Sequence, residues 1–60
     1  MTHSSILAWR NRLGFNKTQA AAALGLSRNG YHAYETGEHP IPLHIALACA
    51  ALAYGLPPLR

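Results

Sequence analysis

The sequence is poor in the residues that would provide a covalent, metal or membrane anchor. It has a single cysteine, Cys49, which cannot form an internal disulfide and is typical of a reducing compartment such as the bacterial cytoplasm. No apolar run reaches the roughly 18 residues of a membrane span, and no signal peptide opens the chain. The histidines have neither paired cysteines nor an i, i+4 partner, so neither a metal nor a cofactor is expected.

Residues that favour β-strands are also scarce. The chain has no valine, whereas half of its residues are hydrophobic and alanine is abundant. A chain of 60 residues forms one domain at most, and it buries only about 60% of the surface that its unfolded form exposes. We therefore predict an all-α fold, a single domain over residues 1–60, and a thin core that oligomerisation would help to stabilise.

Acidic side chains are the third scarcity. Glu35 and Glu38 stand against five lysine and arginine residues, which gives a formal net charge of +3 and is compatible with a polyanionic partner. No serine, histidine and acid arrangement suggests a nucleophile, and no glycine-rich loop suggests a bound phosphate. We therefore do not expect an enzyme.

Capping and glycine signals divide the chain into four helices, at about residues 4–13, 17–24, 27–37 and 43–54. Ser4 or Ser5 is expected to cap the first helix. Asn16 and Gln19 have the spacing of a capping box at the start of the second helix. The second and third helices meet at a tight turn, which predicts a helix-turn-helix at about residues 16–37.

Two basic residues occupy helix starts, where the helix dipole disfavours positive charge. Lys17 opens the second helix and Arg28 opens the third, and neither first turn contains a carboxylate. Such positions can mark phosphate-binding sites, because unpaired N–H groups also point outward there. They can equally be solvated surface charges, and the sequence leaves both interpretations open.

Glu35 lies near the end of the third helix, where the dipole disfavours a negative charge. It therefore needs a cation, and Arg10 on the first helix is the best candidate. We predict an Arg10–Glu35 ion pair between these helices; the alternative is an exposed Glu35 without a partner.

Three stretches resemble the Cro/CI-type (Xre) helix-turn-helix family: LGFNKTQAA at 13–21, LGLSR at 24–28 and YETGE at 34–38. The resemblance continues through PIP at 40–42 and the alanine-rich last helix, and it covers about residues 5–56. The family includes the DNA-binding domains of lambdoid phage repressors and short stand-alone regulators of phages and proteobacteria. The resemblance implies a compact domain of four to five helices, similar to lambda repressor, and a repressor that binds a double-stranded palindromic operator.

The resemblance also implies which residues meet DNA, with the third helix in the major groove. The implied base-reading residues are Arg28, Asn29, His32 and Ala33. The implied phosphate-binding residues are Asn16, Lys17, Arg12 and His39. Two departures concern base preference, because the family usually has glutamine where this chain has Lys17, and Gly30 replaces a residue that commonly helps to contact DNA.

The last helix is nearly all apolar, so a monomer would leave part of it exposed. The expected homodimer interface comprises Leu43, Leu47, Tyr54, Leu56 and Leu59. Alternatively, Leu43 and Leu47 simply complete the core. A different function also fits the same surface, namely an antitoxin-like or other protein-interaction module. No small-molecule effector is expected.

Overall fold

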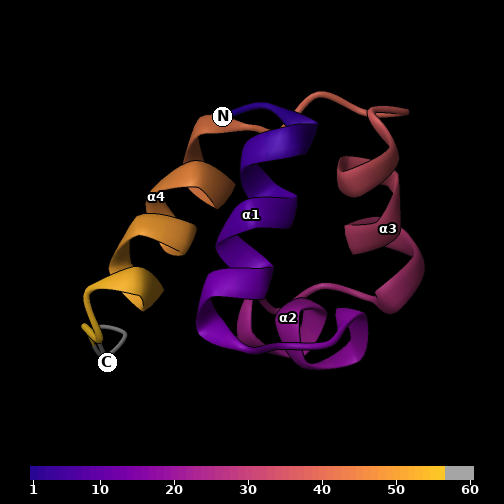
Figure 1. Ribbon diagram of the computed structural model, residues 1–60. Coiled ribbons are helices and arrows are strands. Elements are labelled where there is room, and N and C mark those ends of the chain that lie inside the picture. Colours follow the sequence, from indigo (N-terminus) through magenta and orange to yellow (C-terminus); the bar gives the residue numbers. More distant parts are fainter. Residues whose placement is uncertain (57–60) are drawn as a thin grey trace.

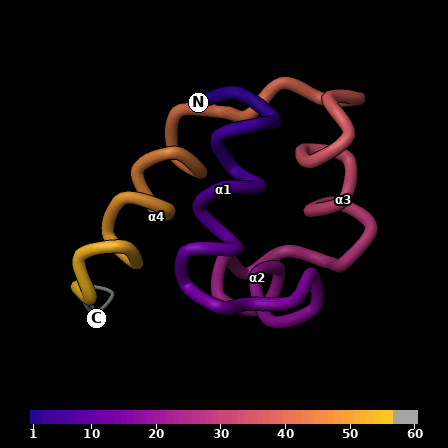
Figure 2. The backbone as a smooth tube through the Cα atoms, viewed as in Figure 1, coloured from indigo at the N-terminus to yellow at the C-terminus, as the bar shows by residue number. Residues whose placement is uncertain are grey.

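The computed structural model describes residues 1–56, which form four helices joined by turns. The helices are α1 (His3–Leu13), α2 (Lys17–Ala23), α3 (Arg28–Thr36) and α4 (Leu43–Ala53). In Figures 1 and 2, α1 runs between α4 and α3, and α2 lies at the C-terminal end of α1. The predicted all-α fold is confirmed. None of the helices within residues 1–56 is long and apolar enough to cross a membrane.

The first helix begins earlier than the sequence predicted, because Thr2 is its cap. The Thr2 hydroxyl oxygen accepts from the Ser5 amide at 3.2 Å, and the Ser5 hydroxyl oxygen accepts from the Thr2 amide at 2.8 Å. Ser5 therefore completes a capping box instead of capping the helix itself, and Ser4 lies inside the helix. The usual residue at the third position of the box is Glu or Gln, so the serine gave no signal for it.

The turn between α2 and α3 is built from local signals. Asn16 Oδ1 accepts from the Gln19 amide at 2.8 Å and Gln19 Oε1 accepts from the Asn16 amide at 2.9 Å, so the predicted capping box is confirmed. Gly25 has a φ of +70°, which lets the Leu26 amide donate back to the Ala21 carbonyl at 2.9 Å and closes α2. The chain then enters α3 directly.

The core lies where α1 meets the other three helices. Its buried members are Ile6, Trp9, Ala20, Ala21, Tyr31, Ile45 and Cys49. Trp9 Nε1 donates to the Cys49 carbonyl at 2.9 Å, which fastens α4 to α1. The alanines of α2 have no side chain beyond Cβ, so this helix can approach its neighbours closely. Burial raises the pKa of the Cys49 thiol to about 11, so this thiol is unreactive at neutral pH.

Candidate nucleic-acid interface

The first half of α3 presents three polar side chains to solvent. Arg28, Asn29 and His32 are exposed and lie at i, i+1 and i+4, which places them on one side of the helix. The Ser27 hydroxyl caps α3 by accepting from the Gly30 amide at 3.1 Å. Within residues 1–56, the side chains of Arg28 and Asn29 make no hydrogen bond. Their donors and acceptors are therefore free to pair with the edges of bases.

Ala33 does not belong to this face, and its predicted role in base reading is wrong. Ala33 keeps only 7% of its surface and is buried, whereas its neighbour His32 is exposed. The chain that leaves α3 bends back at this point, since the His39 amide donates to the Ala33 carbonyl at 3.3 Å. A prediction made from positions around a single helix takes no account of a later segment that folds back onto that helix.

The start of α2 lies beside the outer face of α3. Lys17 is half-buried, and its Nζ lies 2.9 Å from Nδ1 of His32. The sequence predicted that both residues face DNA, but not that they touch, because they belong to different helices. Asn16 is exposed, although its side-chain oxygen is occupied by the capping bond described above.

The remaining phosphate candidates lie elsewhere. Arg12 is exposed in the last turn of α1. His39 is exposed in the loop after α3, at the opposite end of that helix from Arg28. The structure therefore places Lys17 next to the face of α3, while Arg12 and His39 lie on separate segments.

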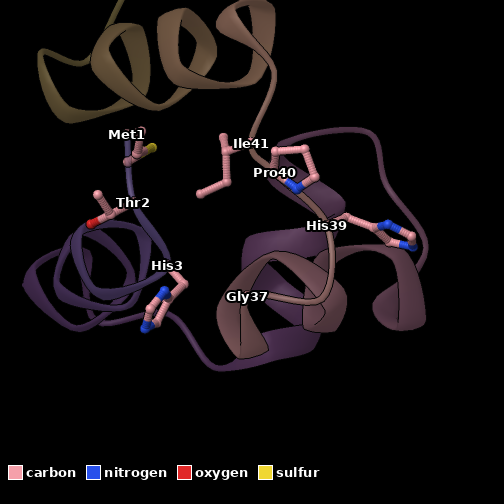
Figure 3. A pocket seen from close by; sticks show the side chains of 7 residues that line it. All are labelled: Met1, Thr2, His3, Gly37, His39, Pro40 and Ile41. Carbon is pink, nitrogen blue, oxygen red and sulfur yellow. The ribbon is translucent and has the colours of Figure 1, made fainter.

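His39 lines a shallow hollow of about 300 Å³ between the N-terminus and the loop before α4 (Figure 3). The hollow is open to solvent, and the rings of His3 and His39 point away from each other across it. Among residues 1–56, no group of three side chains could hold a metal ion.

A partly buried charge network holds α3 against α1. Arg10 Nε donates to Glu35 Oε2 at 2.5 Å, so the structure contains the ion pair expected from the helix dipole. Tyr31, which is fully buried, donates its hydroxyl proton to the same oxygen at 2.6 Å. Arg10 Nη1 also donates to the Phe15 carbonyl at 3.2 Å, and this bond connects the turn before α2 to the same network. The helix that carries Arg28 and His32 is thereby fixed in orientation.

The charges in this network depend on one another. Burial by itself raises the pKa of Glu35, but hydrogen bonds from Tyr31 and Arg10 lower it by more, so the carboxyl pKa lies below its ordinary value. Burial raises the pKa of the Tyr31 hydroxyl, and its bond to the carboxylate raises it further. The bond to Glu35 also raises the pKa of the Arg10 guanidinium. Glu35 is thus an ionised carboxylate inside the domain.

The second exposed surface is the outer face of α4, which we call the α4 face. Leu43, Leu47, Ala50 and Tyr54 recur at i, i+4, i+7 and i+11, which is the spacing of one helical stripe, and all four are exposed. Leu43 and Leu47 keep 74% and 61% of their surface, so the interpretation that they complete the core is wrong. Leu56 follows the helix and is also exposed, whereas Leu59 lies outside the described residues.

The comparison with protein families agrees with this geometry. A family model described as a helix-turn-helix domain matches residues 8–60, a stretch that contains α2, the turn and α3. No curated protein and no solved structure matches the chain.

Proposed function

Since the chain belongs to the helix-turn-helix domain family of DNA-binding domains, we propose that it is a sequence-specific transcriptional regulator with α3 as its recognition helix. The observation that carries the proposal is the outer face of α3, where Arg28 and Asn29 are exposed without internal partners beside the Lys17–His32 pair. An arginine pairs well with guanine and an asparagine with adenine in the major groove. The formal net charge of +3 favours the approach to DNA.

The regulator proposed here is a repressor that acts in the bacterial cytoplasm. The described helices have an exposed polar face on α3 and an exposed hydrophobic face on α4, and a dimer that occupies an operator through α3 would block transcription without any further part. The resemblance to Cro/CI-type regulators supports the same role and suggests the autoregulation of a phage or mobile-element operon.

The α4 face supports binding as a homodimer. Contiguous apolar surface of this kind is normally covered in a small protein, and a second copy of the chain offers an equally apolar surface. A two-fold dimer would place its recognition helices in two half-sites about 34–36 Å apart.

The same face also favours a second candidate, a module that binds another protein as antitoxins do. A purified chain that stays monomeric and binds no DNA would support that candidate.

Selection of bound sequences from random DNA tests the proposal directly. Two arginine substitutions then distinguish base reading from phosphate binding. Arg28→Ala should weaken binding by about 1–3 kcal/mol at one base position and relax the preference there. Arg12→Ala removes another exposed arginine, from α1, and should weaken all sequences alike, with a smaller slope of affinity against salt. Binding isotherms at several salt concentrations measure both effects. If neither variant changes the isotherms, the wrong face has been assigned.

Gly30 provides a test in which the stability of the domain should change while its DNA affinity should not. A Cβ at this position would meet only the Ser27 hydroxyl, at 3.1 Å, and the same helical position is occupied by Gln19 in α2 with its cap intact. Gly30→Ala should therefore stabilise the domain, by somewhat less than the roughly 1 kcal/mol that separates the two residues in a helix. Because residue 30 lies about 200° around α3 from Arg28, at 3.6 residues per turn, it falls outside the face formed by Arg28, Asn29 and His32, and operator affinity should change little. Thermal unfolding and DNA titration of the same sample measure both quantities, and a marked fall in operator affinity would show that this side of α3 also approaches DNA.

A further inference from the structure

We propose that Lys17 is a positioning residue that makes His32 an obligatory hydrogen-bond donor towards DNA. The inference rests on the proposed function for its DNA part and concerns the specificity of the same face. It follows from the contact of 2.9 Å between Lys17 Nζ and His32 Nδ1.

The chemistry of the two groups decides which atom donates. A lysine ammonium has three donors and no acceptor, so Nδ1 of the imidazole must accept. A neutral imidazole with an unprotonated Nδ1 carries its proton on Nε2. The contact therefore selects one of the two tautomers, and the ring presents Nε2–H on its other side.

The surroundings favour a persistent contact. Lys17 is half-buried at the first position of α2, so its side chain has fewer rotamers available than a fully exposed lysine. The helices that carry the two residues are packed together through the tight turn after Ala23 and through the buried Ala20 and Ala21. His32 is exposed, so its Nε2 edge remains accessible to a ligand.

A fixed donor at His32 discriminates between bases. Guanine presents only acceptors, N7 and O6, along its major-groove edge, whereas cytosine presents the N4 amino donor. With Nε2 protonated, His32 can pair with guanine and is opposed donor to donor by cytosine. Without Lys17 the ring could exchange tautomers and accept from an amino group, so the discrimination would weaken. Lys17 would thus influence a base that it does not touch.

The first test needs no DNA. Long-range ¹H–¹⁵N spectra at about pH 8, where an imidazole is neutral, distinguish a protonated from an unprotonated ring nitrogen. We expect the free wild-type protein to show His32 as the Nε2–H tautomer alone. His44 is the internal control, since it is exposed on α4 and makes no side-chain hydrogen bond within residues 1–56. In Lys17→Met, which keeps the length of the stem and removes the donor, His32 should show the tautomer mixture of His44.

The second test measures base preference. Lys17→Met should weaken binding to all sequences, because a positive charge is lost, and should also lower the guanine-over-cytosine preference opposite His32 about fivefold, the size of one ordinary hydrogen bond. The loss of charge weakens binding to both bases equally, so it does not affect the ratio of the two affinities. His32→Gln provides the matched background, because an amide can donate or accept without help from Lys17. In that background Lys17→Met should leave the ratio unchanged.

The outcomes separate this inference from the proposed function. Specific DNA binding with a mixed tautomer at His32, or with an unchanged base ratio in Lys17→Met, would overturn the role of Lys17 and leave the function intact. A single Nε2–H tautomer that reverts in Lys17→Met, in a protein that selects no DNA sequence, would support the positioning and overturn the function.

Discussion

Replacing Glu35 with alanine is expected to remove a large part of the free energy of unfolding of the domain. The Glu35 and Arg10 side chains keep only 6% and 16% of their surface, so the substitution leaves a largely buried guanidinium and the Tyr31 hydroxyl without their shared acceptor. Removing one partner of a fully buried pair costs about 3–5 kcal/mol, and for this partly buried pair we expect a loss of about 3 kcal/mol. A domain of 60 residues has a total stability of about 3–9 kcal/mol at the usual value per residue. The loss is therefore a large share of the total, and circular dichroism with urea titration measures it.

Two variants control this result. Glu38→Ala removes the other glutamate, which is exposed, and should change the free energy of unfolding by less than about 0.5 kcal/mol. Glu35→Gln keeps the size of the side chain and an acceptor for Tyr31 but not the charge, so its stability should lie between the wild type and Glu35→Ala. A Glu35→Ala protein as stable as Glu38→Ala would show that the network contributes nothing.

Acid gives a second readout of the same network. Because the folded-state pKa of Glu35 is lowered, its ionisation contributes stability that is fully present above the ordinary glutamate value of 4.5. That contribution is lost as the pH falls from there through the lower folded-state value. The free energy of unfolding of the wild type should therefore decrease over this range, and Glu35→Gln should show a flatter profile.

The elements of the fold that the sequence predicted are those with local causes. The capping box at Asn16 and Gln19 and the glycine after α2 each act within a few residues, so their spacing predicts where the helices begin and end. The start of α1 was predicted too late in the chain, because its capping box is closed by Ser5 and not by the usual glutamate or glutamine. The partner of Glu35 could be predicted because a carboxylate at the wrong end of a helix needs compensation, and Arg10 was the suitable cation.

The candidate site depended on contacts between segments, and there the sequence was insufficient. Tyr31 lies in the core, but its bond to Glu35 needs one turn of α3 to face Arg10 on another helix. Ala33 has the helical position of an outward residue, yet the chain after α3 returns to it. The contact between Lys17 and His32 depends on how α2 crosses α3. No pattern along one helix contains this information, because it belongs to the relative placement of two.

Leu47→Glu is expected to convert the proposed dimer into a monomer without unfolding it. Leu47 lies in the middle of the α4 face and is 61% exposed, so a glutamate there costs the monomer little. In a two-fold interface each substitution occurs twice, and two carboxylates would be buried opposite an apolar surface without a cation. Sedimentation equilibrium should give a mass of 6.5 kDa for the variant and twice that for the wild type. Unfolding of the dilute variant should follow that of the dilute wild type.

The effect on DNA should be larger than the loss of any single base contact. A dimer that holds one half-site finds the second at a high effective concentration, which increases affinity by about 10²–10⁴. The wild type should therefore bind an operator with two half-sites at least about 100-fold more tightly than one with a single half-site, whereas Leu47→Glu should bind both alike. The single half-site is the control, because a defect in the α3 face would weaken both DNAs equally. A wild-type protein that stays at 6.5 kDa at concentrations of about 100 μM, well above the Kd of an ordinary dimer, and binds both DNAs alike would contradict the dimer and leave the α4 face to a different protein.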